Sequence, residues 1–207
     1  MTSGADRVPP APAAAGLAPV TLGRGDLGEL CALHAELHRL AGAEAPFVRE
    51  TDAFFERHLG GDGAVIGLRA PTGSLAAYAV LGLPGADDPL NFGADLGLAP
   101  AECANVFHLD GSGVRPEWRG RGLQRWLTGE RLRRGVAAGR SVALSAVSPR
   151  NPRSLANLVA SGLWVVALVE KYGDVRFMLR WQADPAPDRA PGPGAAALAS
   201  GSGEGRA

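Results

Sequence analysis

The sequence predicts a mixed α/β fold, in which a central mixed sheet of about six to seven strands is flanked by about four helices. Two observations support this fold class. Apolar segments with the period of a strand alternate along the chain with segments that have the period of a helix. Near the middle, a strand-like segment passes into a helix through a loop that contains Gly120 and Gly122.

The 207 residues are enough for one domain of ordinary size, which we expect to span residues 17–182. Residues 1–16 and 183–207 are rich in Ala, Pro and Gly and carry few large apolar side chains, so we expect disordered tails there. The start of the chain lacks the pattern of a signal peptide, and no stretch approaches the roughly 20 apolar residues that cross a bilayer. We therefore expect a cytoplasmic protein without membrane contact.

Periodicity and turn residues together predict eleven elements. In chain order they are a strand at 19–22, helices at 26–40 and 51–58, strands at 64–69, 74–81 and 105–114, a helix at 123–138, a strand at 141–148, a helix at 154–160, and strands at 163–170 and 175–181.

Capping and turn residues justify the elements of the first half. Asp26 and Thr51 stand where each of the first two helices would begin, and both residue types favour the N-cap position. The turn Pro71-Thr72-Gly73 separates two apolar strands and predicts a hairpin. Residues 83–104 are rich in Gly, Pro and Asp, so we expect a long loop with one helical turn there, of the kind that often lines a binding site.

The second half is justified in the same way. Gly139 ends the helix that begins at Leu123, Ser154 is expected to cap the last helix, and Tyr172-Gly173-Asp174 predicts a second hairpin. Three arginines of the first of these helices are expected to form a solvated edge: Arg131, Arg133 and Arg134.

The formal net charge is zero, but the two halves of the chain differ. Residues 1–104 carry six arginines against thirteen acidic residues, a net charge of −7, whereas residues 105–182 carry a net charge of +8. A polyanionic ligand would prefer the second half. Lys171 is the only lysine, and the basic residues are not interleaved with aromatic ones, so we expect a small phosphorylated cofactor and no nucleic acid.

Cysteine and histidine usage gives no indication of a metal site. Cys31 and Cys103 lack the spacing of metal ligands or of a redox pair, and we expect both to be small buried or half-buried residues. His34 and His38 share a helical face, but no further ligand completes a set.

The loop from Arg115 to Gly122 has the properties of an anion site. The first-turn amides of a helix have no partner within the helix, the helix dipole favours negative charge, and glycines allow a ligand to approach the backbone. Arginines at 115, 119 and 121 add positive charge. A capped turn with solvated arginines is the alternative interpretation of the loop by itself.

Three segments resemble the GNAT superfamily of acyl-CoA-dependent N-acetyltransferases. The signature of that family is Arg or Gln, two free positions, Gly, one free position, then Gly or Ala; Arg119 and Gly122 match it, and Gln124 departs from it at the last position. The lead-in Val114-Arg115-Pro116 is similar to the family's Val-x-Pro. The segment from Ser148 to Asn157, followed by Gly162-Leu163, is similar to its later asparagine helix.

The resemblance implies the GNAT fold over about residues 17–182 and a site for acetyl-CoA. In the family, the loop amides bind the pyrophosphate of CoA, and the preceding strand is splayed from its neighbour so that the pantetheine can pair with it; Gly111 and Gly113 suit the bulge that such a strand needs. Asn157 would bind the cofactor or its loop. The implied cofactor-binding residues are Val114, Arg119, Gly120, Arg121, Gly122, Leu123, Gln124 and Asn157.

The catalytic residues are less clearly marked. His108 and Asp110 alternate with apolar residues on the central strand and are candidates for the base that deprotonates an amine. Asp110 could equally satisfy the turn amides before Gly111. Many family members carry a tyrosine that protonates the thiolate, but residues 158–160 hold none, and Tyr172 is the nearest replacement or simply a structural residue of its turn.

The expected function is therefore transfer of an acetyl group from acetyl-CoA to the primary amine of a small molecule by direct attack, without a metal. The acidic first half favours a small cationic amine, and a homodimer is a possible assembly. The alternative is a non-catalytic acyl-CoA-binding sensor or interaction module. A nucleotide-binding or nucleic-acid-binding protein is the third hypothesis, but the phosphate-loop and dinucleotide fingerprints are absent from the sequence.

Overall fold

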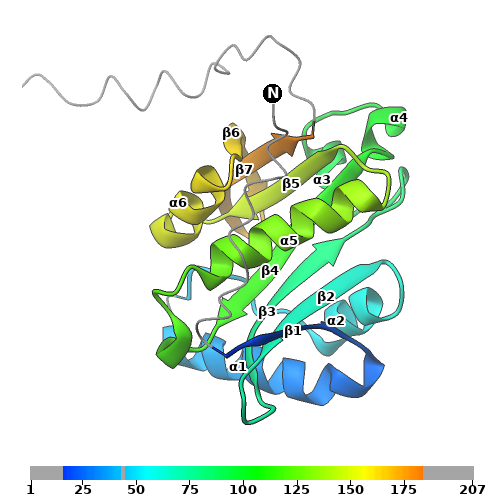
Figure 1. The fold of residues 1–207 in the computed structure, drawn as a ribbon. Helices are drawn as coiled ribbons and strands as arrows, with labels where there is room; N and C mark the ends of the chain where they lie inside the picture. The colour runs from blue at the N-terminus through cyan, green and yellow to red at the C-terminus, as the bar shows by residue number, and fades with distance from the viewer. Residues whose placement is uncertain (1–15, 43–44, 184–207) are drawn as a thin grey trace, which may run out of the picture.

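The computed structural model describes residues 16–42 and 45–183, in which seven strands form one sheet in the order β1-β2-β3-β4-β5-β7-β6 (Figure 1). The strands are β1 (Ala18–Leu22), β2 (Gly63–Arg69), β3 (Leu75–Gly82), β4 (Val106–Val114), β5 (Val142–Val147), β6 (Trp164–Lys171) and β7 (Asp174–Gln182). The pair β4 and β5 is parallel, and the other neighbouring strands are antiparallel.

Four helices of eight or more residues accompany the sheet in the described part of the chain: α1 (Leu27–Ala41), α2 (Asp52–Leu59), α5 (Leu123–Ala137) and α6 (Pro152–Ala160). The mixed α/β fold class, the seven strands and these four helices are confirmed. The predicted tails at 1–16 and 183–207 lie outside the described residues, apart from Gly16 and Ala183.

Three predictions of local structure are corrected. The loop at 83–104 holds two short helices, α3 (Phe92–Asp95) and α4 (Pro100–Cys103). Helix α6 begins two residues earlier than predicted, and its cap is Asn151, which accepts from the Ser154 amide. Asp26 stands at the N-cap position of α1, but its carboxylate accepts from the Gly23 amide and pairs with Arg69, whereas Thr51 caps α2 as predicted.

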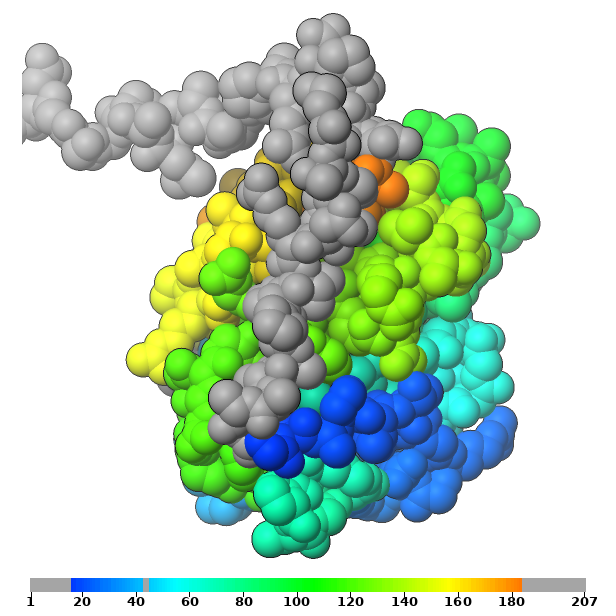
Figure 2. All heavy atoms as spheres, viewed as in Figure 1, coloured from blue at the N-terminus to red at the C-terminus, as the bar shows by residue number. Residues whose placement is uncertain are grey.

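The helices cover the two faces of the sheet separately (Figure 1). Leu30, Leu33 and Phe55 of α1 and α2 pack on Val65 and Val80, on one face of β2 and β3. On the opposite face, α5 packs on the same strands and on β4, and α6 contributes Leu158 to the core over β5 and β7. In Figure 2, α1 (blue) lies at the lower edge of the molecule and α6 (yellow) at its left edge. The alternation of side chains along each strand therefore decides which helix layer a residue faces.

Strand β4 separates from β5 halfway along its length. The two strands pair only over Val106–His108 and Val142–Leu144, after which β5 stays paired with β7 alone as far as Val147. On its other edge, β4 has a bulge: Leu81 pairs with Leu109 and Ala79 with Ser112, so that Asp110 and Gly111 together oppose Val80. The bulge bends β4 away from β5 and opens the sheet between them, as predicted.

Gly113 serves the packing of β4. A Cβ at this position would lie 2.4 Å from Leu37 Cδ1 and 2.7 Å from Tyr78 Cε1. Helix α1 can therefore approach the opened part of β4 only because residue 113 has no side chain.

Candidate active site

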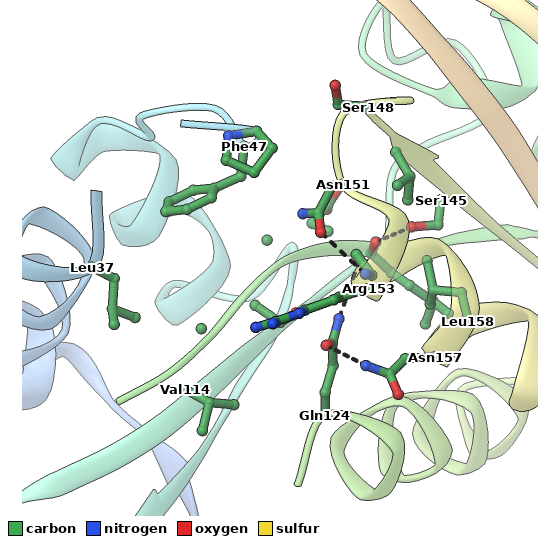
Figure 3. A pocket seen from close by; sticks show the side chains of 18 of the residues that line it. Leu37, Phe47, Val114, Gln124, Ser145, Ser148, Asn151, Arg153, Asn157 and Leu158 are labelled. Atoms are coloured by element: carbon green, nitrogen blue, oxygen red, sulfur yellow. Dashed lines mark hydrogen bonds between the residues drawn. The ribbon is translucent and has the colours of Figure 1, made fainter. Parts of the chain in front are cut away.

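The opening between β4 and β5 leads into a cavity of about 900 Å³ that crosses the sheet. Its walls come from α1, the segment after α1, the second half of β4, the loop before α5, the starts of α5 and α6, the end of β5, and the turn between β6 and β7. In Figure 3, Leu37 and Phe47 lie on one side of the cavity, and Ser145 and Leu158 lie on the other. Chain segments far apart in the sequence thus line one cavity.

The glycine loop forms one end of this cavity. Gly120 and Gly122 have φ values of 76° and 73°, and a Cβ at either position would meet nothing within 4 Å. No side chain caps α5, whereas α2 and α6 are capped by Thr51 and Asn151. The first-turn amides of α5 therefore keep their hydrogen-bonding capacity for a ligand that carries negative charge.

The structure brings most of the predicted cofactor-binding residues to this end. Lining the cavity are Val114, Arg119, Gly120, Gly122, Leu123, Gln124 and Asn157. Arg121 is not among the lining residues, because its guanidinium lies over the Trp118 ring, 4.9 Å from the centroid.

Gln124 joins the starts of α5 and α6. Its Nε2 donates to Ser154 Oγ over 3.2 Å, and its Oε1 accepts from Asn157 Nδ2 over 2.8 Å (Figure 3). Asn157 therefore holds the loop side of the site in place. The residue that departs from the family signature has both ends of its amide engaged in this link.

Arg131 of α5 donates hydrogen bonds to backbone carbonyls at the bulge of β4. The prediction that Arg131 is solvated is wrong: it is 1% exposed, and its Nη1 donates to the carbonyls of Asp110 and Val80 over 2.8 and 3.2 Å. The bulge leaves these carbonyls without ladder partners, and a buried carbonyl needs a donor. Burial lowers the pKa of Arg131 to about 10, against the attraction of Asp110, so the guanidinium stays charged.

Ser145 performs a similar task across the opening. Its Oγ donates to the carbonyl of Leu109 over 2.8 Å, one residue beyond the last backbone pair between β4 and β5. This side-chain bond replaces the ladder bond that the separation removes.

Asp110 lies in the cavity wall on the face of the sheet opposite α5, with its side chain 10% exposed. Its Oδ2 is 3.5 Å from His58 Nε2, and its Oδ1 is 3.9 Å from His108 Nδ1. Burial raises the pKa of Asp110, but His58, His108 and Arg131 together lower it below the usual value. Burial lowers the pKa of His58, and its bonds to Asp110 and to the Phe54 carbonyl outweigh that effect and raise it. The pair therefore favours an ionised Asp110.

His108 lies behind Asp110, outside the lining residues of the cavity. Its ring stacks on Phe92 at 3.9 Å between centroids, and its Nε2 accepts from the Phe92 amide over 3.0 Å. Burial lowers the pKa of His108, against the attraction of Asp110. The neutral ring anchors α3 to β4.

Glu50 also lines the cavity, on the same side as Asp110, although no sequence motif indicated it. Its amide donates to His34 Nε2 over 2.9 Å, and the other ring nitrogen of His34 donates to the Tyr78 hydroxyl over 2.7 Å. Burial lowers the pKa of His34 to about 4, which keeps the ring neutral in this role. Burial, followed by repulsion from Asp110, raises the pKa of Glu50 to about 7.

Tyr172 and Arg176 complete the wall. Tyr172 has a positive φ of 59°, next to Gly173 at 71°, in the two-residue turn that joins β6 to β7. Burial, with repulsion from Asp110 and Glu50, raises the pKa of Tyr172, so the phenol stays protonated. Arg176, on β7, is 7% exposed.

Metal binding and membrane crossing find no support in residues 16–42 and 45–183. These residues contain no group of three or more His, Cys, Asp or Glu side chains that could hold a metal ion. Both cysteines are free, with Cys103 buried and Cys31 half-buried. Within the same ranges, no helix combines the length and the apolar character that a membrane span requires.

Comparison with known sequences gives no family assignment: no protein-family model matches the chain, and a search of curated proteins finds no match. Solved structures do resemble it. A GNAT superfamily phosphinothricin acetyltransferase from Sinorhizobium meliloti, in complex with acetyl-CoA, has a TM-score of 0.61 and 17% identity over 86% of this chain and 94% of that chain.

Two further structures have different stated substrates. The ribosomal-protein-S18-alanine N-acetyltransferase from Escherichia coli has a TM-score of 0.59 and 16% identity over 84% of this chain and 98% of that chain. An aminoglycoside acetyltransferase in complex with coenzyme A and kanamycin has a TM-score of 0.53 and 15% identity over 80% of this chain and 94% of that chain. The opened seven-stranded sheet and these likenesses together show that the chain has the fold of the GNAT acetyltransferases.

Proposed function

We propose that the protein is an N-acetyltransferase that moves an acetyl group from acetyl-CoA to the primary amine of a small molecule. One observation carries the proposal: a single cavity connects the uncapped start of α5, through the opening between β4 and β5, to the carboxylates of Glu50 and Asp110. The likeness to acetyltransferases solved with acetyl-CoA or coenzyme A supports the choice of donor.

The donor end fits a phosphorylated, amide-bearing cofactor. The α5 amides and the unobstructed glycines at 120 and 122 suit the pyrophosphate, because oriented amides stabilise negative charge at a helix start. The β4 edge that faces β5 has no strand partner beyond His108. Side chains already bind the carbonyls of Leu109, Asp110 and Val114, and the remaining backbone groups of this edge can pair with the pantetheine amides. The thioester would then lie in the opening.

The acceptor end fits an amine that arrives as an ammonium ion. The ionised Asp110 would attract it, and Glu50, with a pKa of about 7, would take its proton at neutral pH. The neutral amine attacks the thioester carbon, the C–N bond forms, and the C–S bond breaks to release the thiolate of CoA. The attacking nitrogen loses its second proton in this step, which replaces the proton that the thiolate receives from its donor. Tyr172 is the protonated group at the cavity that could supply a proton to this thiolate.

Matched tryptophan substitutions test the donor site. Gly122→Trp would place a large side chain at the start of α5, whereas Gly139→Trp introduces the same side chain beyond its far end, at a similar φ of 80° and in equally open space. Both variants carry the strain of a positive φ, so both should fold with a similar loss of stability. Calorimetry should detect CoA binding to the wild type and to Gly139→Trp and none to Gly122→Trp. Equal affinity in all three would refute the donor site.

Release of free thiol from acetyl-CoA in the presence of a panel of amines tests catalysis. We expect thiol release that depends on the amine. Binding of CoA without thiol release on any amine would instead support the sensor or interaction module.

A further inference from the structure

Arg176 is a buried cation without a partner. It is 7% exposed and lines the cavity, and within the described part of the chain no carboxylate or carbonyl forms an ion pair or hydrogen bond with its guanidinium; its buried Nε has no acceptor. A buried charge is costly unless it is paired and hydrogen-bonded. Arg180 on the same strand shows the contrast, because its Nη2 donates to Gln182.

Two acidic residues near the turn between β6 and β7, Asp174 and Asp95 of α3, are hydrogen-bonded to other cations. Asp174 Oδ2 accepts from Arg150 Nη2 over 2.8 Å, and Asp95 Oδ2 accepts from Lys171 Nζ over 2.6 Å. The guanidinium of Arg176 lies over the ring of Tyr172, and its Cζ is 5.9 Å from the ring centroid. The charge of Arg176 contributes to the lowered pKa of Asp174, but no carboxylate of the described residues bonds to the guanidinium, which can therefore bind an anionic group of a ligand in the cavity.

The strand register places Arg176 on the acceptor side of the sheet. Arg176 and Met178 share one face of β7, and Met178 packs with Phe92 and Leu144. Leu179 and Trp181, on the other face, pack with Leu158 of α6. Arg176 thus faces away from α5 and α6, whose starts form the proposed cofactor end, and the CoA phosphates are not its natural partner.

The carboxylates of the acceptor end lie on this same face. Asp110 alternates along β4 with Leu109, which packs in the core beneath α5 and α6. The Tyr172 hydroxyl responds to both charges: after the effect of burial, Asp110 and Glu50 raise its pKa and Arg176 lowers it. Charges of both signs therefore act on Tyr172, and Asp110, Glu50 and Arg176 line the same cavity.

We infer that the acceptor is a free amino acid, whose ammonium group lies at Asp110 and Glu50 and whose carboxylate pairs with Arg176. A guanidinium offers two parallel donors that match a carboxylate, and the opposite charges fix the direction in which a zwitterion enters. The inference rests on the proposed transferase function and narrows its acceptor from amines in general to amines that carry a carboxylate.

Amino acids and their α-carboxamides form the discriminating pairs, because each pair shares its side chain and α-amino group and differs in the anionic group. Free thiol released from acetyl-CoA gives kcat/KM for the standard protein amino acids and for their carboxamides. For the preferred side chain, we expect the wild type to favour the acid by about tenfold to a hundredfold, the range of a charge-assisted bond. The amide group makes the amine less basic, so intrinsic reactivity near neutral pH would favour the carboxamide.

Two arginine variants locate the source of the preference. Arg176→Met should lower the ratio of acid to carboxamide to one or below, and Arg176→Lys should restore part of the preference for the acid, because lysine keeps the charge but loses the paired donors. Arg180→Met removes the same charge from the same strand outside the cavity lining and should keep the wild-type ratio. CoA binding by each variant shows that it is folded.

The outcomes separate the inference from the proposed function. Thiol release with carboxamides or other amines, without a preference for acids in the wild type, would overturn the amino-acid acceptor and leave the transferase intact. A preference that survives Arg176→Met would overturn the role of Arg176. Thiol release with no amine at all, despite CoA binding, would overturn both.

Discussion

Replacing Glu50 by glutamine should remove a titration near neutral pH from both the rate and the stability of this protein. The Glu50 carboxyl lies in the cavity wall, where burial and the neighbouring Asp110 raise its pKa to about 7. Glutamine keeps the shape of the side chain and cannot accept a proton. If Glu50 takes the proton of the acceptor, the wild-type rate must follow the fraction of Glu50 that is ionised.

The size of the effect follows from this pKa. With a pKa of about 7, roughly a tenth of Glu50 is ionised at pH 6 and roughly nine tenths at pH 8. The ratio of wild-type to Glu50→Gln kcat/KM should therefore rise about tenfold between these pH values.

The free energy of unfolding depends on the ionisation of Glu50 as well. The pKa of Glu50 is raised on folding, from 4.5 to about 7, so between these values the folded state holds a proton that the unfolded state has released. The contribution of Glu50 to the free energy of unfolding is therefore fully present below pH 4.5 and is lost as the pH rises to about 7. Relative to the wild type, Glu50→Gln should therefore gain up to about 1.4 kcal/mol per pH unit across this window.

Thiol release at a series of pH values and urea unfolding at the same values measure the two effects. Glu56→Gln is the matched control, because Glu56 is exposed on α2 and its loss removes the same charge outside the cavity lining. A ratio that stays flat from pH 6 to pH 8, while the stability difference appears, would refute Glu50 as the proton acceptor. A flat stability difference would refute the raised pKa itself.

Two further substitutions test the packing around the opened sheet. Arg131→Met leaves the buried carbonyls of Val80 and Asp110 without their donor, and we expect it to lower the free energy of unfolding by about 2–4 kcal/mol in urea titrations. The control Arg125→Met, at an exposed position of the same helix, should change this free energy by less than about 0.5 kcal/mol. Equally small effects of both substitutions would contradict the role of Arg131 at the bulge. Gly113→Ala forces a Cβ against Leu37 and Tyr78 and should cost about 1–3 kcal/mol by thermal or urea unfolding. Gly111→Ala, whose Cβ would meet only Glu50 Cγ at 4.0 Å, should cost less, and the reverse order would refute the close approach of α1 to β4.

The donor end of the site could be predicted because its signals are local. Two glycines at a junction of strand and helix determine where backbone amides are free, and a change of periodicity locates that junction. The same holds for the hairpins and for the Thr51 cap, which depend on residues next to one another. The cap of α6 was misplaced because Asn151 and Ser154 both favour that position, and Pro152, which fits the first turn of a helix, decides between them.

The acceptor end could be predicted only in part: the sequence indicated Asp110 and Tyr172, but not Glu50 or Arg176, because these residues meet only in the folded chain. Glu50 follows α1, Asp110 lies on β4 and Arg176 on β7, and no spacing relates them. The solvated edge assigned to Arg131 was wrong for the same reason: helical periodicity identifies the face of a side chain, but the bulge in β4 supplies the carbonyls that bind it.

The sequence by itself determined the order of the elements, the loop at Gly120 and Gly122, and hence the end of the site that suits a phosphorylated donor. The tertiary structure decided which charges face the cavity, that Asp110 favours its ionised form while Glu50 titrates near neutrality, and that Arg176 is left without a partner. The physical reason is that the two kinds of property depend on different neighbours. Backbone conformation depends on neighbours along the chain, whereas burial and pairing of charges depend on residues that only the fold brings together.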